Sequence, residues 1–317
     1  MIQIRKQLFK VLFKKLQCDQ SLFSQFLMFD HITQSVPYQH IQLPYPLHLD
    51  IKRLDLIHPQ ISGNKFFKLK YNLLAAKQQA LSGVLTFGGA YSNHIAATAY
   101  AAHLFGFKSV GIIRGEELAT QPLNPTLAKA QSLGMHLHFV SRTEYRLRDD
   151  VNYLQQLHNQ FPETFIIPEG GSNELAVQGC QEILSQSDLQ NYDVICCAVG
   201  TGGTISGLIE RSAPHQKVLG FSALKGDFLQ QEIQQWTKKQ NWSLTDAYCC
   251  GGYAKTSPEL LAFIENFEEQ HAVPLEPIYT GKMMFGLFDL IKNNYFPERT
   301  RILAIHSGGL QADIRNK

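Results

Sequence analysis

The sequence predicts an α/β protein whose mostly parallel sheets are covered by helices on both faces. From about residue 83, short apolar runs alternate with longer stretches of helical periodicity, and several apolar runs end in glycine-rich or polar loops. This alternation is typical of βαβ units, whose binding sites lie at the carboxyl ends of the strands. A chain of 317 residues with 44% hydrophobic content can bury a large core, and its length favours about two domains.

The predicted strands and helices follow one another in two series. The first series has strands at 84–87, 109–113, 136–140 and 165–167, separated by helices at 95–104, 126–133 and 151–161. The second has strands at 194–199, 218–221 and 302–305, with helices at about 203–211, 228–239 and 283–292. The stretch 242–258, which contains paired cysteines and glycines, is predicted to be irregular.

Composition favours a small-molecule partner. The 29 basic and 27 acidic side chains leave a formal charge of +2, too even a balance for nucleic acid or an anionic membrane surface as the main partner. No run of about 18 apolar residues occurs, so we expect no membrane span. The six cysteines form no CxxC pair, which favours buried, reduced thiols and a cytoplasmic location.

The first 27 residues differ from the rest and predict a short basic amphipathic helix. Apolar residues alternate there with Arg5, Lys6, Lys10, Lys14 and Lys15 at roughly helical spacing. A transit or surface-binding segment would have this pattern. The favoured interpretation is that this segment is a packing arm, or that translation starts at Met28.

Two lysines three residues apart, Lys65 and Lys68, are the candidate reactive pair. If a helix begins near Asn64, both amines lie on one face, and each disfavours the charged form of the other. A neutral amine attacks a carbonyl to form a Schiff base, so Lys65 is the predicted reactive group. The alternative is a solvated basic helix face that continues through Lys70 and Lys77.

A glycine-rich loop after the run 194–199 is the candidate anion site, and it consists of Gly200, Thr201, Gly202, Gly203 and Thr204. Glycines let backbone N–H groups converge on an anion, and the start of a helix adds partial positive charge. The loop is neither a Walker motif nor the dinucleotide fingerprint, since Ile205 stands where the last glycine would be. The alternative is a tight turn without a ligand.

Two more polar segments end apolar runs. Ser92, Asn93 and His94 open the helix predicted at 95–104, where Ser92 would cap the helix or help to hold a carboxylate or phenolate oxygen. Near the C-terminus, Ser307 lies in a His-Ser-Gly-Gly segment after the last predicted strand. Any one such loop could be a turn, but the loops and the lysine pair together indicate a single binding site.

These motifs resemble a known family, the pyridoxal-phosphate enzymes grouped as 1-aminocyclopropane-1-carboxylate deaminase and D-cysteine desulfhydrase, of the tryptophan synthase β-subunit fold type. The matching segments, in order over about residues 30–310, are 51–55, 63–69, 92–94, 200–204, 279–282 and 306–309. The resemblance implies two open three-layer α/β domains with pyridoxal 5'-phosphate in the cleft between them. The large domain would comprise 28–67 and 176–317, the small domain 68–175, and residues 1–27 would be an N-terminal extension.

The resemblance also implies roles for individual residues. Lys65 would form the Schiff base with the cofactor, and Lys68 with the 200–204 loop would bind its phosphate. Asn93 would contact the ring oxygen, and Ser307 would face the pyridine nitrogen. The substrate-binding residues would be Ser92, Asn93, His94 and Tyr279, and the catalytic residues Lys65, Ser92 and Tyr279.

Departures from the family pattern guide the choice of substrate. Thr280 follows Tyr279, as in the desulfhydrase branch, where the deaminase branch has a glutamate. Leu54 and Ser62 replace an acid and a glycine of the usual pattern. Tyr253 matches a substrate-side tyrosine only loosely, and a packing role is the alternative.

The expected reaction is therefore α,β-elimination, in which freed Lys65 takes the α-proton and a β-thiolate departs. D-cysteine would yield pyruvate, ammonia and sulfide. The alternatives are 1-aminocyclopropane-1-carboxylate deamination, elimination from another D-amino acid, racemisation, and a non-enzymatic cofactor-binding protein. The resemblance also implies a homodimer.

Overall fold

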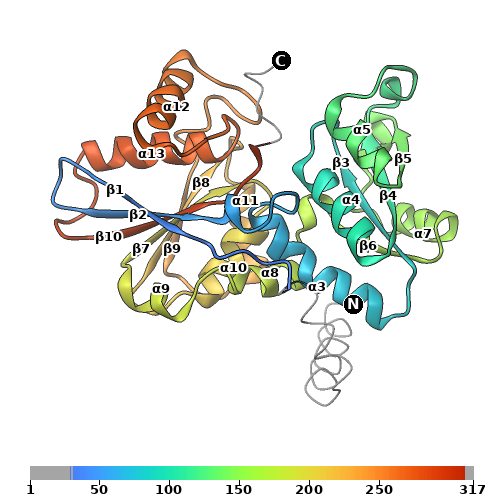
Figure 1. Cartoon of the computed structure of the whole chain (residues 1–317), viewed down its shortest axis with the longest axis horizontal. Helices are drawn as coiled ribbons and strands as arrows, with labels where there is room; N and C mark the ends of the chain where they lie inside the picture. Colours follow the sequence, from blue (N-terminus) through green and yellow to red (C-terminus); the bar gives the residue numbers. More distant parts are fainter. Residues whose placement is uncertain (1–28, 30, 311–317) are drawn as a thin grey trace. The chain divides into compact units, whose positions relative to one another are not determined.

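A computed structural model describes residue 29 and residues 31–310. Residues 35–310 belong to one compact unit, which contains two sheets (Figure 1). The amphipathic helix predicted in residues 1–27 lies outside the described residues.

The larger sheet has six strands in the order β1-β2-β10-β7-β8-β9. Its strands are β1 (Tyr38–Ile41), β2 (His48–Arg53), β7 (Val194–Val199), β8 (Lys217–Ser222), β9 (Trp242–Thr245) and β10 (Arg301–His306). Only the β1–β2 pair is antiparallel. All six residues of β7 are buried, as expected for a central strand of a parallel sheet covered on both faces.

Helices cover both faces of this sheet. Figure 1 shows α12 (Pro258–His271) and α13 (Thr280–Lys292) on one side, and α9 (Gln186–Asn191) and α10 (Gly203–Arg211) on the other. Leu260 and Ile264 of α12 and Leu287 of α13 pack with β7 and β10 in the main core. A further helix, α11 (Phe228–Trp236), follows β8.

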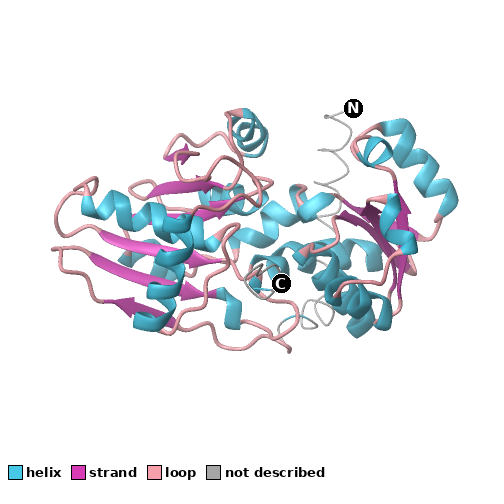
Figure 2. Cartoon of the chain, turned by 90° about the horizontal axis from the view of Figure 1, so that it is seen from above, coloured by secondary structure: helices cyan, strands magenta, loops and turns pink. Residues whose placement is uncertain are grey.

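The smaller sheet has four parallel strands in the order β5-β4-β3-β6. They are β3 (Gly83–Gly88), β4 (Lys108–Arg114), β5 (Met135–Val140) and β6 (Thr164–Ile167). One apolar cluster joins this sheet to α7 (Val151–Gln160), and another joins it to α4 (Asn93–Phe105) and α5 (Pro125–Ser132). Figure 2 shows helices flanking both sheets.

Two helices connect strands of one sheet to strands of the other and pack against each other. They are α3 (Asn64–Gln78), between β2 and β3, and α8 (Glu174–Gln181), between β6 and β7. At Gly179 a Cβ would lie 2.0 Å from the carbonyl oxygen of Phe67, so this helix contact requires a glycine. The expected domain limits at 67/68 and 175/176 fall inside these two helices, and the division into domains stays a prediction. The remaining short elements are η1 (Leu54–Leu56), η2 (Glu116–Thr120), α6 (Arg142–Tyr145) and η3 (Glu169–Gly171).

All seven predicted strands and all six predicted helices occur in the structure. The strands β1, β2 and β9 and the helices α6, α8, α9 and α12 were not predicted. The interpretation of 242–258 as irregular is wrong at its start, where β9 lies; this edge strand is only partly buried and therefore lacks the apolar run that marks a strand. Within the described part of the chain, no helix is long and apolar enough to cross a membrane.

Candidate active site

Lys65 lies in the first turn of α3 and is partly buried. Its Nζ donates to Asn64 Oδ1 at 2.9 Å, and Asn64 Nδ2 donates to Thr204 Oγ1 at 2.8 Å. These bonds connect the start of α3 to the start of α10. Burial, and to a smaller extent the positive charge of Lys68, lower the pKa of Lys65 to about 7. The amine is therefore largely neutral just above neutral pH.

Lys68, one helical turn later, is 3% exposed. Its Nζ donates to the Gly170 carbonyl at 2.8 Å, to Ser172 Oγ at 2.9 Å and to Thr201 Oγ1 at 3.4 Å. Burial lowers its pKa to about 8. The like-charge effect that the sequence predicts for Lys65 is present, but burial is the larger cause of the shift.

The glycine-rich loop lies beside this ammonium group. Gly202, with a φ of +81°, immediately precedes α10, and a Cβ at Gly203 would lie 2.8 Å from Ser172 Oγ and 3.3 Å from Lys68 Nζ. A Cβ at Gly200 would lie 2.9 Å from the Tyr279 ring. Small residues therefore keep a lysine ammonium beside the N–H groups that open a helix, an arrangement that suits an anion.

The loop that supplies Gly170 and Ser172 was not identified from the sequence. This loop joins β6 to α8, and Asn173 caps α8 by accepting from the backbone N–H of Ala176. The available signal was the pair Gly170 and Gly171 followed by a Ser-Asn cap, directly after an apolar run.

Ser92 caps α4, because its Oγ accepts from the backbone N–H of Ile95 at 3.2 Å. Next to it, Asn93 is close to the C-terminal turn: a Cβ at Gly309 would lie 2.9 Å from Asn93 Nδ2. Asn93 Oδ1 is buried and has no hydrogen-bond partner among the described residues. An unpaired buried amide oxygen is costly and marks bonding capacity for a ligand.

His94 is buried, and its hydrogen bonds define its tautomer. Thr86 Oγ1 donates to the Ile167 carbonyl at 2.9 Å, so it accepts from His94 Nε2 at 2.8 Å. Burial, with the charges of Lys65 and Lys68, holds the pKa of His94 well below its usual range, and Nδ1 has no partner within the described ranges. The neutral ring therefore offers an acceptor, so any bond from residue 94 to a carboxylate would have to come from its backbone N–H.

Ser307 follows β10 and lies against the start of α3. The backbone N–H of Asn64 donates to the Ser307 carbonyl at 3.1 Å. Gly63 has a φ of +67°, and a Cβ there would lie 1.8 Å from that same carbonyl oxygen. The turn that carries Ser307 and the segment that carries Lys65 are thus in backbone contact.

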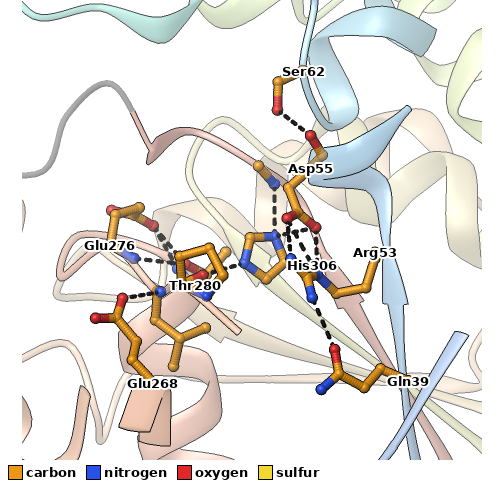
Figure 3. Close-up of polar contacts among 11 residues, drawn as sticks. Gln39, Arg53, Asp55, Ser62, Glu268, Glu276, Thr280 and His306 are labelled. Carbon is orange, nitrogen blue, oxygen red and sulfur yellow. Dashed lines mark hydrogen bonds and ion pairs between the residues drawn. The ribbon is translucent and has the colours of Figure 1, made fainter. Parts of the chain in front are cut away.

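Tyr279 immediately precedes α13, and its position depends on Glu276. The buried Glu276 carboxylate accepts from the backbone N–H groups of Ile278, Tyr279 and Thr280 at 2.7, 2.8 and 2.6 Å. Figure 3 shows Glu276 beside Thr280. Burial raises the pKa of Tyr279 well above its usual range, so the phenol stays protonated. Glu276 was not identified from the sequence, because it lies seven residues before the helix predicted at 283–292 and no local pattern marks it.

Tyr253, which the sequence matched only loosely, lies near Tyr279 with ring centroids 6.1 Å apart. It is half exposed, and its loop is held by Lys282, whose Nζ donates to the carbonyls of Cys249 and Gly252 at 2.8 and 2.9 Å. A substrate-side position and a packing position both remain compatible with this contact. The described cysteines, Cys180, Cys196, Cys197, Cys249 and Cys250, are all free thiols.

Comparisons with known proteins agree with these features. The family model described as pyridoxal-phosphate dependent enzyme matches residues 44–308. A putative 1-aminocyclopropane-1-carboxylate deaminase of Thermotoga maritima is 31% identical, over 84% of this chain and 90% of that protein. A D-cysteine desulfhydrase of Serratia proteamaculans is 30% identical, over 83% and 86%.

Another relative carries both activities in its name. The bifunctional D-cysteine desulfhydrase/1-aminocyclopropane-1-carboxylate deaminase of Arabidopsis thaliana, a mitochondrial protein, is 31% identical over 84% of this chain and 74% of that protein. Among solved structures, a homologue of 1-aminocyclopropane-1-carboxylate deaminase superposes with a TM-score of 0.73 at 24% identity, covering 90% of this chain and 95% of the other. That likeness confirms the fold.

Proposed function

Because the chain belongs to the family of pyridoxal-phosphate dependent enzymes, we propose that it catalyses α,β-elimination from a small D-amino acid, with D-cysteine as the substrate. The products would be pyruvate, ammonia and sulfide. The observation that carries the proposal is the Lys65 amine, with a pKa of about 7, next to the Lys68 and glycine-loop anion site.

The residues present fit pyridoxal phosphate. The cofactor has an aldehyde, which needs a neutral amine, and a phosphate, which needs cationic and N–H donors. Lys65 supplies the first requirement, and Lys68 with Gly200, Thr201, Gly202, Gly203 and Thr204 supplies the second. Asn93 Nδ2 would donate to the ring oxygen, and Ser307 would face the pyridine nitrogen.

Bound pyridoxal phosphate supplies an electron sink for negative charge at the substrate α-carbon. The protein contributes the proton transfer: Lys65 Nζ, neutral above about pH 7, accepts the α-proton. Asn64, which bonds both Lys65 and Thr204, orients this amine toward the cofactor side of α3.

Ser92 and the first N–H groups of α4 would hold the substrate carboxylate, since a helix N-terminus favours an anion. Tyr279 would line the reacting side. Because its phenol stays protonated, it can donate a hydrogen bond to the departing sulfur as negative charge develops there.

Position 280 supports the choice of D-cysteine. The Thr280 side chain is fully buried, and its Oγ1 donates to Glu276 Oε1 at 3.1 Å. A glutamate at this position, as in the deaminase branch, would bring a second buried carboxylate beside Glu276, and two like charges at that distance are unfavourable. The relatives named as 1-aminocyclopropane-1-carboxylate deaminases make ring opening the second candidate.

The test is sulfide release from D-cysteine by the cofactor-loaded protein, with L-cysteine as the stereochemical control. Release from the D form alone supports the proposal. A protein that binds cofactor but is silent with D-cysteine rules out the desulfhydrase. A panel of 1-aminocyclopropane-1-carboxylate, D-serine and β-chloro-D-alanine then separates the other eliminations, and silence throughout indicates a non-enzymatic cofactor-binding protein.

We further propose a cytoplasmic homodimer. The five described cysteines are free, which suits a reducing compartment, and the family resemblance implies the dimer. Sedimentation equilibrium of the native protein tests the assembly: a mass near twice 35.8 kDa supports a dimer, and a single-chain mass contradicts it.

A further inference from the structure

A buried histidine, His306, ends β10 directly before Ser307 and bonds two separate backbone positions. Its Nε2 lies 2.7 Å from the carbonyl oxygen of Pro274, which only accepts, so Nε2 carries a proton and donates. Its Nδ1 accepts from the backbone N–H of Gly308 at 3.3 Å. The imidazole is 1% exposed and acts as a donor at one end and an acceptor at the other.

Asp55 also approaches this ring, with Oδ1 3.2 Å from Nδ1. Its carboxylate, however, already accepts from Arg53, through Nε at 2.9 and 3.2 Å and Nη2 at 2.6 Å (Figure 3). Arg53 Nη1 in turn donates to Gln39 Oε1 at 2.8 Å. The charge of Asp55 is thus balanced by Arg53 without a positive charge on His306.

Burial lowers the pKa of His306, although the neighbouring Asp55 raises it. The net lowering agrees with the hydrogen bonds, since a protonated Nδ1 could not accept from Gly308. Both observations describe a neutral imidazole in its Nε2–H form.

The same cluster contacts the start of the lysine helix. Ser62 Oγ donates to the backbone carbonyl of Asp55 at 3.2 Å, and the Gly63 N–H donates to the Leu54 carbonyl at 3.0 Å. A Cβ at Gly308, whose φ is +72°, would lie 2.7 Å from Ser62 Oγ. There is no free space between the two segments, so a shift of one moves the other.

We propose that His306 is a positioning residue: as a neutral bridge from Pro274 to Gly308 it holds Ser307 in place, and through the close contact of Gly308 with Ser62 it sets the start of the helix that carries Lys65. The inference rests on the proposed roles of Ser307 and Lys65 toward the cofactor. It differs from an ion-pair role, in which a cationic His306 would serve mainly to neutralise Asp55.

Glutamine is the discriminating substitution, because its amide places a donor and an acceptor about as far apart as the two imidazole nitrogens. His306→Gln can keep both bonds while staying neutral. His306→Leu removes both, and leaves the Gly308 N–H and the Pro274 carbonyl buried without partners. The loss of such hydrogen-bond partners typically weakens an equilibrium that depends on them, here cofactor binding, by about tenfold or more.

The experiment is a titration of each apo-protein with pyridoxal phosphate, followed by the visible absorption of the bound cofactor and without any substrate. We expect His306→Leu to raise the dissociation constant roughly tenfold and to shift the absorption maximum, and His306→Gln to stay within about threefold of the wild type. Leu303→Ala, a buried truncation on the same strand that leaves the cluster intact, controls for lost stability and should keep the wild-type spectrum.

Two results overturn the proposal. One is a folded His306→Leu protein with wild-type affinity and spectrum. The other is a His306→Gln protein as weak as His306→Leu, which would mean that a cationic ring is required. If His306→Leu does not fold, His306→Asn replaces it, since its shorter amide cannot reach both partners and should show the same weakening. Because no substrate is present, the outcome is independent of whether D-cysteine is the substrate.

Discussion

The two sides of the candidate site differ in how their polar atoms are satisfied. On the lysine side, formed by residues 62–68 and 306–308, hydrogen bonds hold Asn64, Lys68 and His306 within the protein. On the α4 side, formed by residues 88–94, Asn93 Oδ1 and His94 Nδ1 are buried without partners in the described part of the chain. An unpaired buried polar atom costs about 1–3 kcal/mol. The lysine side is therefore organised by the chain itself, whereas the α4 side keeps bonding capacity for ligands.

The largest expected effect is on the lysine side. Lys65→Ala removes the amine that we propose binds cofactor and accepts the α-proton, so we expect turnover to fall by about 10²–10⁴-fold or more and the visible band of the bound cofactor to vanish. Absorption spectra and sulfide release measure both effects. Lys77→Ala, at the exposed end of the same helix, is the control and should behave as wild type. A Lys65→Ala protein that retains band and activity would disprove the assignment of this lysine.

The second prediction concerns the contact between the two segments of the lysine side. Gly63→Ala should lower the free energy of unfolding by about 2–4 kcal/mol, because its Cβ meets the Ser307 carbonyl and its φ is left-handed. Gly106→Ala shares the left-handed φ but has no atom within 4 Å of its Cβ, so it should cost only about 1 kcal/mol. Urea unfolding of the apo-proteins compares the two. Equal losses would show that backbone strain, and not the close contact, is what Gly63 avoids.

On the α4 side, Ser92→Ala should leave cofactor bound but reduce kcat/KM for D-cysteine by roughly 10–100-fold, the loss expected when one bond to a charged group is removed. It also removes a helix cap, which costs about 1 kcal/mol of stability. Ser257→Ala removes an equivalent cap from α12, whose Leu260 N–H also lies 3.2 Å from the capping oxygen. If both variants lose activity equally, the effect belongs to capping and not to substrate binding.

The smallest expected effect is a shift in the pH at which the Lys65 amine becomes reactive. Because the pKa of Lys65 is lowered, its amine is protonated and unreactive below about pH 7 and neutral above it. Addition of pyridoxal, which lacks the phosphate, should therefore speed up through a midpoint near pH 7. Lys68→Met removes a neighbouring positive charge and should move that midpoint to higher pH. A wild-type midpoint near the ordinary lysine value of 10.5 would contradict the burial of the amine.

Much of the fold followed from local patterns. The central strands, such as β7, are continuous apolar runs because both faces of a parallel sheet are buried, and this signal needs no knowledge of partners. Edge strands such as β1 and β9 are partly exposed and lack it. The loop at Gly170 to Ser172 was not recognised although it follows the predicted strand at 165–167, because only the tertiary structure brings it to Lys68.

The sequence by itself determined the fold class and the order of the motifs, and it made Lys65 the candidate reactive group, because apolar periodicity, glycine and lysine spacing are properties of neighbouring residues. Only the tertiary structure decided that burial outweighs Lys68 in lowering the pKa of Lys65, that the His94 ring faces Thr86, and that His306 bonds Pro274. Protonation states and hydrogen-bond directions depend on atoms that distant segments bring together, and no local pattern encodes those partners.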